Sequence, residues 1–353
     1  MSRTDVDQPF FEVHVDDEDA KKELEEISNA DFIAFDDKFF DILGKKPNLK
    51  SFFGLEHSPS LREALIYVPE LNTMFASDMG TRKQMKINLT NEPTLEYIEL
   101  KPHLDSINGA IYSTKDKLTY STVNPSKDLG VSAGIYSVDP VTLETKVVVN
   151  NFIGHHFNSP NDLTLHDDTI WFTDPPYAAL LGNGTTAELR PVVWSFNLKT
   201  GLLRPVDEDI QLPNGIAISP NGKTLYVADT GALNTPIGHP TTPSRHHSIY
   251  AYDVKDGIAF NKRLLYLSDL WVPEGVKLSR SGYIYTPAGN FIDIISPEGV
   301  LVGKIRTPGL MQNICFAGPN LDELWMVGLG GAYRALIADK GIPFKKTSFR
   351  IQN

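Results

Sequence analysis

The chain has 353 residues, of which 41% are hydrophobic and 22% charged, a composition typical of a soluble globular protein with a large core. Its formal charge of −11 argues against a nucleic-acid partner, because a protein that binds the phosphate backbone needs a basic surface. The single cysteine, Cys315, excludes an internal disulfide, and the apolar run around it is typical of a core residue rather than a nucleophile.

Residues 1–40 are interpreted as an N-terminal arm and residues 41–353 as one domain. The arm lacks the apolar segment of a signal peptide, and no part of the chain approaches 18 uninterrupted apolar residues. We therefore expect a cytoplasmic protein that acts on a small molecule and has no membrane partner. The acidic segment DDEDAKKELEEIS is compatible with a short amphipathic helix, although a solvated arm is the favoured interpretation.

From residue 62 onward the chain repeats one pattern six times. Each copy opens with a polar residue and a short alternating apolar run, passes through a turn, and enters a second apolar run. The copies are REALIYVPELNTMFASD, INGAIYSTKDKLTYST, PNDLTLHDDTIWFTD, PNGIAISPNGKTLYVAD, PEGVKLSRSGYIYTP and QNICFAGPNLDELWMVG. Such internal similarity indicates a repeat architecture in which each unit is one small sheet.

Further strands are expected in these units. Aromatic alternation in GIYSVDP, VVWSFNL, SIYAYDV and FIDIISP predicts a third strand, and KVVVNNF, LLRPVDE, LLYLSDL and VGKIRTP are compatible with a fourth. With almost no helical periodicity, the sequence predicts an all-β fold, a six-bladed β-propeller with four-stranded antiparallel blades around a central channel. The segment KPNLKSFFG is expected to close the ring as the outer strand of the last blade.

Six aligned polar residues are expected to form a ring, because the innermost strand of every blade lines the channel. They are Glu63, Asn108, Asn161, Asn214, Glu274 and Asn313. Each copy by itself is more typical of a turn, since Asn-Gly and Pro-Asn-Asp are turn signals. The need for a turn does not explain the two glutamates, however. Six polar residues at the same position of six copies favour a binding site.

Carboxylate and amide oxygens, with no His or Cys among them, are the donors that a hard divalent cation prefers. Two carboxylates would balance the charge of the cation, and without it their repulsion would raise the pKa of one of them. The sequence therefore predicts one bound divalent cation, with Ca²⁺ as the first choice and Mg²⁺, Mn²⁺ or Zn²⁺ as alternatives. Oxygen-only ligation disfavours a structural zinc site.

The repeated segments resemble the senescence-marker-protein/gluconolactonase family of calcium-dependent six-bladed propellers, and especially its fungal lactonase branch. Matching stretches extend from about residue 40 to 330, and FNSPNDLTLHDDTIWFTDPPYA is the most specific of them. The resemblance implies a propeller that hydrolyses lactones. It also implies a metal ion held by Glu63, Asn161, Asn214 and Glu274, and it places Asn108 near the substrate.

Two positions depart from the family's pattern. The family's Pro-Asp-Gly is Pro-Glu-Gly here, so the carboxylate of Glu274 extends about 1 Å further, which leaves both the substrate and the reaction open. Many fungal relatives have His where this chain has Arg62. Its permanent charge would either favour an anionic substrate or pair with an acid away from the site.

The implied reaction is the opening of a lactone to a hydroxy acid, carried by Glu274, Asn161 and Glu63. The metal would polarise the carbonyl and Glu274 would activate a water molecule. His156 and Tyr177 are expected at the mouth of the channel, beside the substrate. Asp162 is expected to support its turn or to orient the ligands rather than to bind the metal directly. Two other acids, Asp174 and Asp229, are expected to form turns at strand ends.

The chain contains no Gly-x-Ser-x-Gly elbow, P-loop or dinucleotide fingerprint, which disfavours a serine hydrolase or a nucleotide-dependent enzyme. Two other functions stay open: a propeller enzyme of secondary metabolism, such as an isomerase, cyclase or other ester hydrolase, and a metal-free binding propeller. The segment 231–247 has no strand pattern and is interpreted either as a lid over the channel or as an unstructured excursion. The particular lactone and the oligomeric state do not follow from the sequence.

Overall fold

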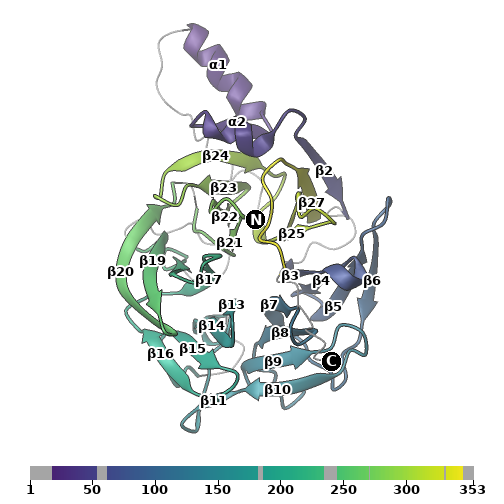
Figure 1. The fold of residues 1–353 in the computed structure, drawn as a ribbon, viewed down its shortest axis with the longest axis vertical. Coiled ribbons are helices and arrows are strands. Elements are labelled where there is room, and N and C mark those ends of the chain that lie inside the picture. The colour runs from purple at the N-terminus through teal and green to yellow at the C-terminus, as the bar shows by residue number, and fades with distance from the viewer. Residues whose placement is uncertain are drawn as a thin grey trace, which may run out of the picture.

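Six antiparallel sheets surround one axis (Figure 1). The computed structural model describes residues 18–53, 62–181, 186–233, 245–269, 271–329 and 331–344. In each sheet the strands follow one another from the axis to the rim. The predicted all-β, six-bladed β-propeller is therefore confirmed. No helix within these ranges is long and apolar enough to cross a membrane.

The two inner strands of each blade coincide with the six repeated segments. The innermost strands, in the order of blades 1 to 6, are β3 (Arg62–Val68), β7 (Ile107–Ser113), β13 (Leu163–His166), β17 (Pro213–Ile218), β21 (Lys277–Leu278) and β25 (Met311–Ala317). The second strands are β4 (Thr73–Asp78), β8 (Leu118–Val123), β14 (Thr169–Asp174), β18 (Thr224–Asp229), β22 (Ile284–Ala288) and β26 (Glu323–Gly328).

The two outer strands complete each blade and confirm the predicted third and fourth strands. The third strands are β5 (Lys83–Asn88), β9 (Gly134–Val138), β15 (Val192–Asn197), β19 (Ser248–Lys255), β23 (Phe291–Ile295) and β27 (Gly331–Leu336). The fourth strands are β6 (Thr94–Ile98), β10 (Thr145–Val149), β16 (Leu203–Asp207), β20 (Ile258–Leu267), β24 (Leu301–Arg306) and β2 (Asn48–Phe52).

The hydrophobic core lies between neighbouring blades rather than at the axis. Tyr120 and Ile135 of blade 2, for example, share one buried cluster with Phe172 and Trp194 of blade 3. The inner strands of a blade are thus covered on both faces by the two neighbouring blades, and strands such as β17 are buried along their whole length. Rigid packing of each blade against the next fixes where the inner strands end, and therefore where their polar residues lie.

The ring is closed by a strand from the N-terminal side of the chain. β2 pairs with β27 as the fourth strand of blade 6, with Leu49 opposite Ala335. Phe52 of β2 packs on Trp325, with ring centroids 5.0 Å apart. This pairing confirms the prediction for KPNLKSFFG. It also joins segments near both ends of the chain in one blade, so the two ends depend on each other for stability.

The preceding segment is built into the fold, contrary to the favoured interpretation of a solvated arm. It forms the helix α1 (Glu18–Asn29), the strand β1 (Phe32–Ala34) and the helix α2 (Lys38–Leu43). β1 pairs with β24 as a fifth strand of blade 5. Phe39 of α2 is fully buried against Gly303, where an added Cβ would lie 2.3 Å from the Phe39 ring. The Arg306 guanidinium donates hydrogen bonds to the carbonyls of Ile27 and Ala30 at the end of α1.

Candidate active site

The inner strands of neighbouring blades approach closely at the level of the six aligned residues. A Cβ added to Gly215 would lie 2.2 Å from the Glu274 carbonyl oxygen, and one added to Gly109 would lie 2.5 Å from that of Asn161. Only glycine fits such an approach of one backbone to another. Because each of these glycines follows an aligned Asn, the chain brings these polar residues together around the axis. We call Glu63, Asn108, Asn161, Asn214, Glu274 and Asn313 the axial ring.

Two amides of the axial ring donate to its two carboxylates. Asn214 Nδ2 lies 2.7 Å from Glu274 Oε2, and Asn313 Nδ2 lies 3.1 Å from Glu63 Oε2. In each pair the amide nitrogen must face the carboxylate, since a carboxylate only accepts hydrogen bonds. The amide oxygen of Asn214 is therefore turned away from Glu274 and is available to a ligand.

Burial changes the acidity of both carboxylates. It raises the pKa of Glu274 to about 7, and the hydrogen bond from Asn214 partly offsets this rise. The pKa of Glu63 lies well above its ordinary value because of burial and the nearby charge of Glu274. The two carboxylates therefore repel each other inside the protein, as expected for a pair that shares one site.

Two further amides of the axial ring are buried without protein partners. Asn161 is 6% exposed and Asn108 is 7% exposed. Neither side chain makes a hydrogen bond to another residue in the described part of the chain. No atom of either amide is among the fully buried, unpaired side-chain atoms of the described residues, so both amides keep some exposure to solvent, where a ligand, an ion or water can contact them.

A threonine on the second strand of blades 2 and 3 holds the next blade's ring residue in place. Thr122 Oγ1 donates to the carbonyl of Asn161, and Thr173 Oγ1 donates to the carbonyl of Asn214, both over 2.7 Å. Thr173 Oγ1 also accepts the N–H of Asp162 over 3.1 Å. The sequence analysis did not single out these threonines, although their shared place near the end of the second strand is a signal of their role.

An ion pair crosses the axis. Lys277 Nζ of blade 5 lies 3.3 Å from Asp162 Oδ2 of blade 3, although blade 4 stands between them in the ring. The other Asp162 oxygen accepts the N–H of Leu163 over 2.8 Å. The charge of Lys277 also lowers the pKa of Glu63, against the larger effect of burial. The sequence analysis missed Lys277, whose only signal is a charge within the apolar run GVKLS.

Tyr177 lies beside the axial ring. It begins the short helix α3 (Tyr177–Leu180), and its hydroxyl lies 3.2 Å from Asn214 Nδ2 and 2.5 Å from Thr230 Oγ1. Thr230 Oγ1 in turn donates to the Leu212 carbonyl over 3.0 Å. Burial raises the pKa of Tyr177, so the phenol stays protonated at neutral pH.

Two residues expected near the substrate lie elsewhere. His156 is exposed on β12 (His155–His156), which pairs with β11 (Asn151–Phe152) at the outer rim, beside β10 and β16 (Figure 1). Its backbone N–H donates to Glu188. Arg62 is buried. Burial raises the pKa of Tyr97 on β6 and of Tyr333 on β27, and the charge of Arg62 partly offsets both rises. The structure thus places Arg62 between blades 1 and 6, and it does not bring His156 to the axial ring.

The two acids at strand ends have the predicted structural role. Asp174 accepts the N–H groups of Asn158 and Ser159, and Asp229 accepts those of Gln211 and Leu212, all within 3.0 Å. Each carboxylate thus fixes the loop that leads into the inner strand of its own blade. Most of the segment 231–247, interpreted from sequence as a lid or an excursion, lies outside the described residues.

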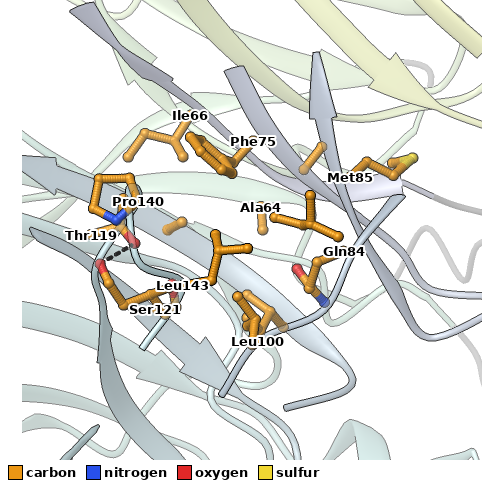
Figure 2. A pocket seen from close by; sticks show the side chains of 15 residues that line it. Ala64, Ile66, Phe75, Gln84, Met85, Leu100, Thr119, Ser121, Pro140 and Leu143 are labelled. Atoms are coloured by element: carbon orange, nitrogen blue, oxygen red, sulfur yellow. Dashed lines mark hydrogen bonds between the residues drawn. The ribbon is translucent and has the colours of Figure 1, made fainter. Parts of the chain in front are cut away.

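The lone cysteine and the interblade cavity are distinct from the axial ring. Burial raises the pKa of Cys315 to about 11, so its thiol stays protonated at neutral pH. Figure 2 shows a cavity of about 30 Å³ between blades 1 and 2, lined mainly by apolar side chains such as Ile66, Phe75 and Leu143. This volume holds water but not a lactone. The axial ring is therefore the better candidate for an active site.

Comparisons with known proteins cover most of the chain. A family model described as "SMP-30/Gluconolactonase/LRE-like region" matches residues 61–329, which include the whole axial ring. Lactonohydrolase oryL of Aspergillus oryzae is 35% identical over 337 residues, covering 90% of this chain and 76% of that protein.

Solved structures share the fold. The gluconolactonase XC5397 from Xanthomonas campestris aligns with a TM-score of 0.72 at 22% identity, covering 87% of this chain and 95% of that one. Regucalcin from Agrobacterium tumefaciens, described as a calcium-binding protein, aligns with a TM-score of 0.63 at 15% identity, covering 83% and 96%. These two likenesses establish the propeller alone. Because the family model spans well over half of its length, the chain belongs to the SMP-30/gluconolactonase/LRE-like family.

Proposed function

We propose that this protein is a metal-dependent hydrolase that opens a lactone to a hydroxy acid. The observation that carries the proposal is the axial ring: a buried carboxylate, Glu274, a half-buried one, Glu63, and several amides meet at the axis of a propeller from a family that includes lactone hydrolases. The relative oryL is named a lactonohydrolase, and XC5397 is described as a gluconolactonase.

The residues of the axial ring fit a divalent cation. Glu63 and Glu274 supply negative charge that burial makes costly without a counter-charge, and Asn161 supplies a buried amide with no protein partner. The described residues contain no group of three or more His, Cys, Asp or Glu that could hold a metal ion, so we assign amide oxygens to the rest of the ligand set. We assign Glu63, Asn161, Asn214 and Glu274 as ligands and Ca²⁺ as the first choice of ion.

When bound, such a cation polarises a lactone carbonyl and stabilises the developing oxyanion. The chain's own residues would supply the other parts of the reaction. Glu274 would accept the proton of the attacking water: burial raises the pKa of its carboxyl group, and a bound cation would lower that pKa again. Asn108, buried and without a protein partner, would bind the substrate. Tyr177 would keep the Asn214 amide oriented through its hydrogen bond.

The first test is the metal content of the purified protein, followed by thermal melts with and without a chelator. We expect one bound divalent ion, and a melting temperature that falls on chelation and recovers with Ca²⁺. Glu274→Gln should lose both the recovery and the hydrolysis of lactones, because it removes one ligand charge and the proposed base.

Glu188→Gln is a matched control for this test, since Glu188 lies near the exposed β11–β12 hairpin and not in the axial ring. It should keep the Ca²⁺ response and the activity of the wild-type protein. A wild-type protein without bound metal, whose melt is unmoved by chelation and by Ca²⁺, would contradict the proposal and favour a metal-free binding propeller.

A further inference from the structure

A second polar cluster lies at the same edge of blade 4 as the axial ring. Asp229 ends β18, and its backbone pairs with Pro213 on one side and with Ser248 on the other. Pro213 precedes the ring residue Asn214, and His246 comes two residues before Ser248. Because neighbouring strands are about 4.8 Å apart, His246 stands roughly 10 Å from the axial ring, on the same face.

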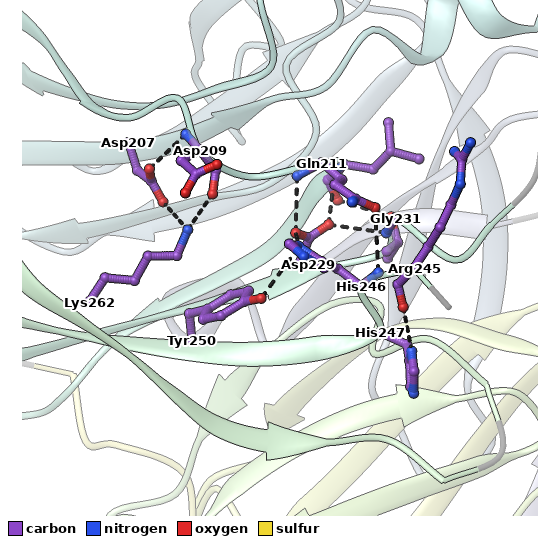
Figure 3. Close-up of polar contacts among 12 residues, drawn as sticks. Asp207, Asp209, Gln211, Asp229, Gly231, Arg245, His246, His247, Tyr250 and Lys262 are labelled. Atoms are coloured by element: carbon purple, nitrogen blue, oxygen red, sulfur yellow. Dashed lines mark hydrogen bonds and ion pairs between the residues drawn. The ribbon is translucent and has the colours of Figure 1, made fainter. Parts of the chain in front are cut away.

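The imidazole of His246 is directed back toward the axis. Its Nδ1 lies 2.8 Å from Asp229 Oδ2, and Asp229 is fully buried on the strand between β19 and the innermost strand (Figure 3). The same carboxylate accepts the backbone N–H groups of Gln211, Leu212 and Gly231. Because its hydrogen bonds fix the Asp229 carboxylate, this carboxylate holds the imidazole of His246 in one orientation.

The neighbouring blade shows what the aspartate does without a histidine. Asp174 of blade 3 is equivalent to Asp229 and fixes its loop through the N–H groups of Asn158 and Ser159. Within the described part of the chain, no histidine contacts Asp174. The loop therefore needs the aspartate alone, and His246 is an addition in blade 4 that the structural role of Asp229 does not explain.

The contacts of His246 also define its free atom. A carboxylate accepts the Nδ1 proton, which leaves Nε2 of the neutral ring as a hydrogen-bond acceptor. The side chain is 41% exposed, and Nε2 has no partner among the residues that the structure describes. The Tyr250 hydroxyl lies 3.3 Å from Nδ1, and its ring stands edge-on to the imidazole with centroids 5.9 Å apart.

One ion pair lies near this cluster. Lys262 lies over the Tyr250 ring, 4.5 Å from its centroid, and pairs with Asp207 over 2.7 Å. Lys262 also donates to the backbone carbonyl of Asp209. Arg245 precedes His246, and its carbonyl oxygen lies 2.7 Å from His247 Nδ1. Asp229 is therefore the acid that sets the orientation of the imidazole.

A continuous polar path joins this cluster to the axial ring. The Tyr177 hydroxyl contacts both Asn214 of the ring and Thr230, the residue after Asp229. We propose that His246, oriented by Asp229, determines substrate specificity: its Nε2 accepts a hydrogen bond from a hydroxyl that the lactone carries away from its carbonyl. A lactone with such a hydroxyl would then bind more tightly than one without it. This inference rests on the lactonase function proposed above.

The test compares two lactones with the same six-membered ring, glucono-δ-lactone, which carries hydroxyls, and δ-valerolactone, which carries none. For His246→Phe we expect the KM for glucono-δ-lactone to rise about tenfold, the size of one lost hydrogen bond, with kcat within about twofold of the wild type. The kinetics with δ-valerolactone should not change. His246→Gln keeps an acceptor and should recover part of the lost affinity.

His247→Phe is the matched control, since this neighbouring histidine bonds only a backbone carbonyl among the described residues and should leave both substrates unaffected. An unchanged KM for glucono-δ-lactone in His246→Phe would overturn the inference, and so would an equal rise for both lactones, which would indicate a general structural role. Failure of the wild-type protein to hydrolyse either lactone would overturn the proposed function together with this inference. If the wild type hydrolyses these lactones but His246→Phe changes the KM for both by the same factor, only this inference would be overturned and the proposed function would stand.

Discussion

Glu63 and Glu274 are ordinary glutamates in the sequence, and their burial changes what they can do. Burial raises both pKa values, and mutual repulsion adds to the rise at Glu63. Neutral amides are their closest partners, through Asn313 and Asn214. An amide satisfies a hydrogen bond but does not neutralise charge, so a divalent cation would stabilise this arrangement more than any of the observed contacts does.

These shifts predict how stability depends on pH. A carboxylate whose pKa is raised on folding stabilises the protein below its unfolded pKa, and this contribution disappears as the pH rises through the folded pKa. For Glu274, raised from 4.5 to about 7, the loss is about 3 kcal/mol. The metal-free protein should therefore melt at a lower temperature at pH 8 than at pH 5, whereas Ca²⁺ should raise the melting temperature more at pH 8.

Scanning calorimetry of chelated and Ca²⁺-loaded protein across this pH range checks the prediction. Glu274→Gln should flatten the pH dependence of the metal-free protein, because glutamine does not titrate. A melting temperature of the metal-free protein that stays level or rises from pH 5 to pH 8 would speak against the buried, repelling pair.

At the scale of strands, neighbouring blades are joined near the axis by hydroxyl groups of the second strands. Thr173 donates to the Asn214 carbonyl of the next blade and accepts the N–H group of Asp162, the residue before the innermost strand of its own blade. It is fully buried. One side chain thus sets the distance between β13 and β17, and with it the position of Asn214 in the axial ring.

Thr173→Val should therefore affect both stability and ion binding. It leaves the buried carbonyl of Asn214 without its hydroxyl donor, which should lower the free energy of unfolding by about 2 kcal/mol in urea titrations. It should also weaken Ca²⁺ binding several-fold in calorimetric titrations. Thr119→Val is the control, because Thr119 is buried and donates to the Val138 carbonyl within blade 2. Equal Ca²⁺ affinities of the two variants would show that Thr173 does not position the axial ring.

The whole molecule depends on the closure of its ring at blade 6. β2 supplies the outer strand there, and Phe52 covers Trp325. The seam between blade 6 and blade 1 also passes through the axial ring, since Asn313 lies on one side and Glu63 on the other, joined by a hydrogen bond of 3.1 Å. Closure at the rim and geometry at the axis are therefore linked.

Removal of residues 1–53 should open this seam. We expect the melting temperature to fall by at least about 10 °C and the stabilisation by Ca²⁺ to disappear, because Glu63 and Asn313 would no longer be held together. Removal of residues 1–30 deletes α1 and its contacts with Arg306 but retains β1, β2 and the closed ring. That shorter deletion should keep the Ca²⁺ response, and loss of the response in both proteins would contradict the link between closure and the axial ring.

The sequence by itself determined the propeller and the axial ring, because both are local and repeated. The strands of each blade are neighbours in sequence, and the same opening position in six copies must reach the same place near the axis. The closing strand was also predicted, since a six-unit ring needs a fourth strand in its last blade.

Only the tertiary structure decided which residues from different blades and loops meet. Lys277 and Asp162 are 115 residues apart and pair because blades 5 and 3 face each other across the axis. His246 is held by a hydrogen bond to Asp229, and it precedes β19 in a segment whose sequence shows no repeated pattern from which this contact could be predicted. Closeness in sequence to a residue of the axial ring does not by itself bring a side chain to the axis. Arg62 precedes Glu63 on β3, where successive side chains point to opposite faces of the sheet. His156 lies in the β11–β12 hairpin at the rim. A repeat determines where each unit lies, whereas contacts between units depend on packing in three dimensions.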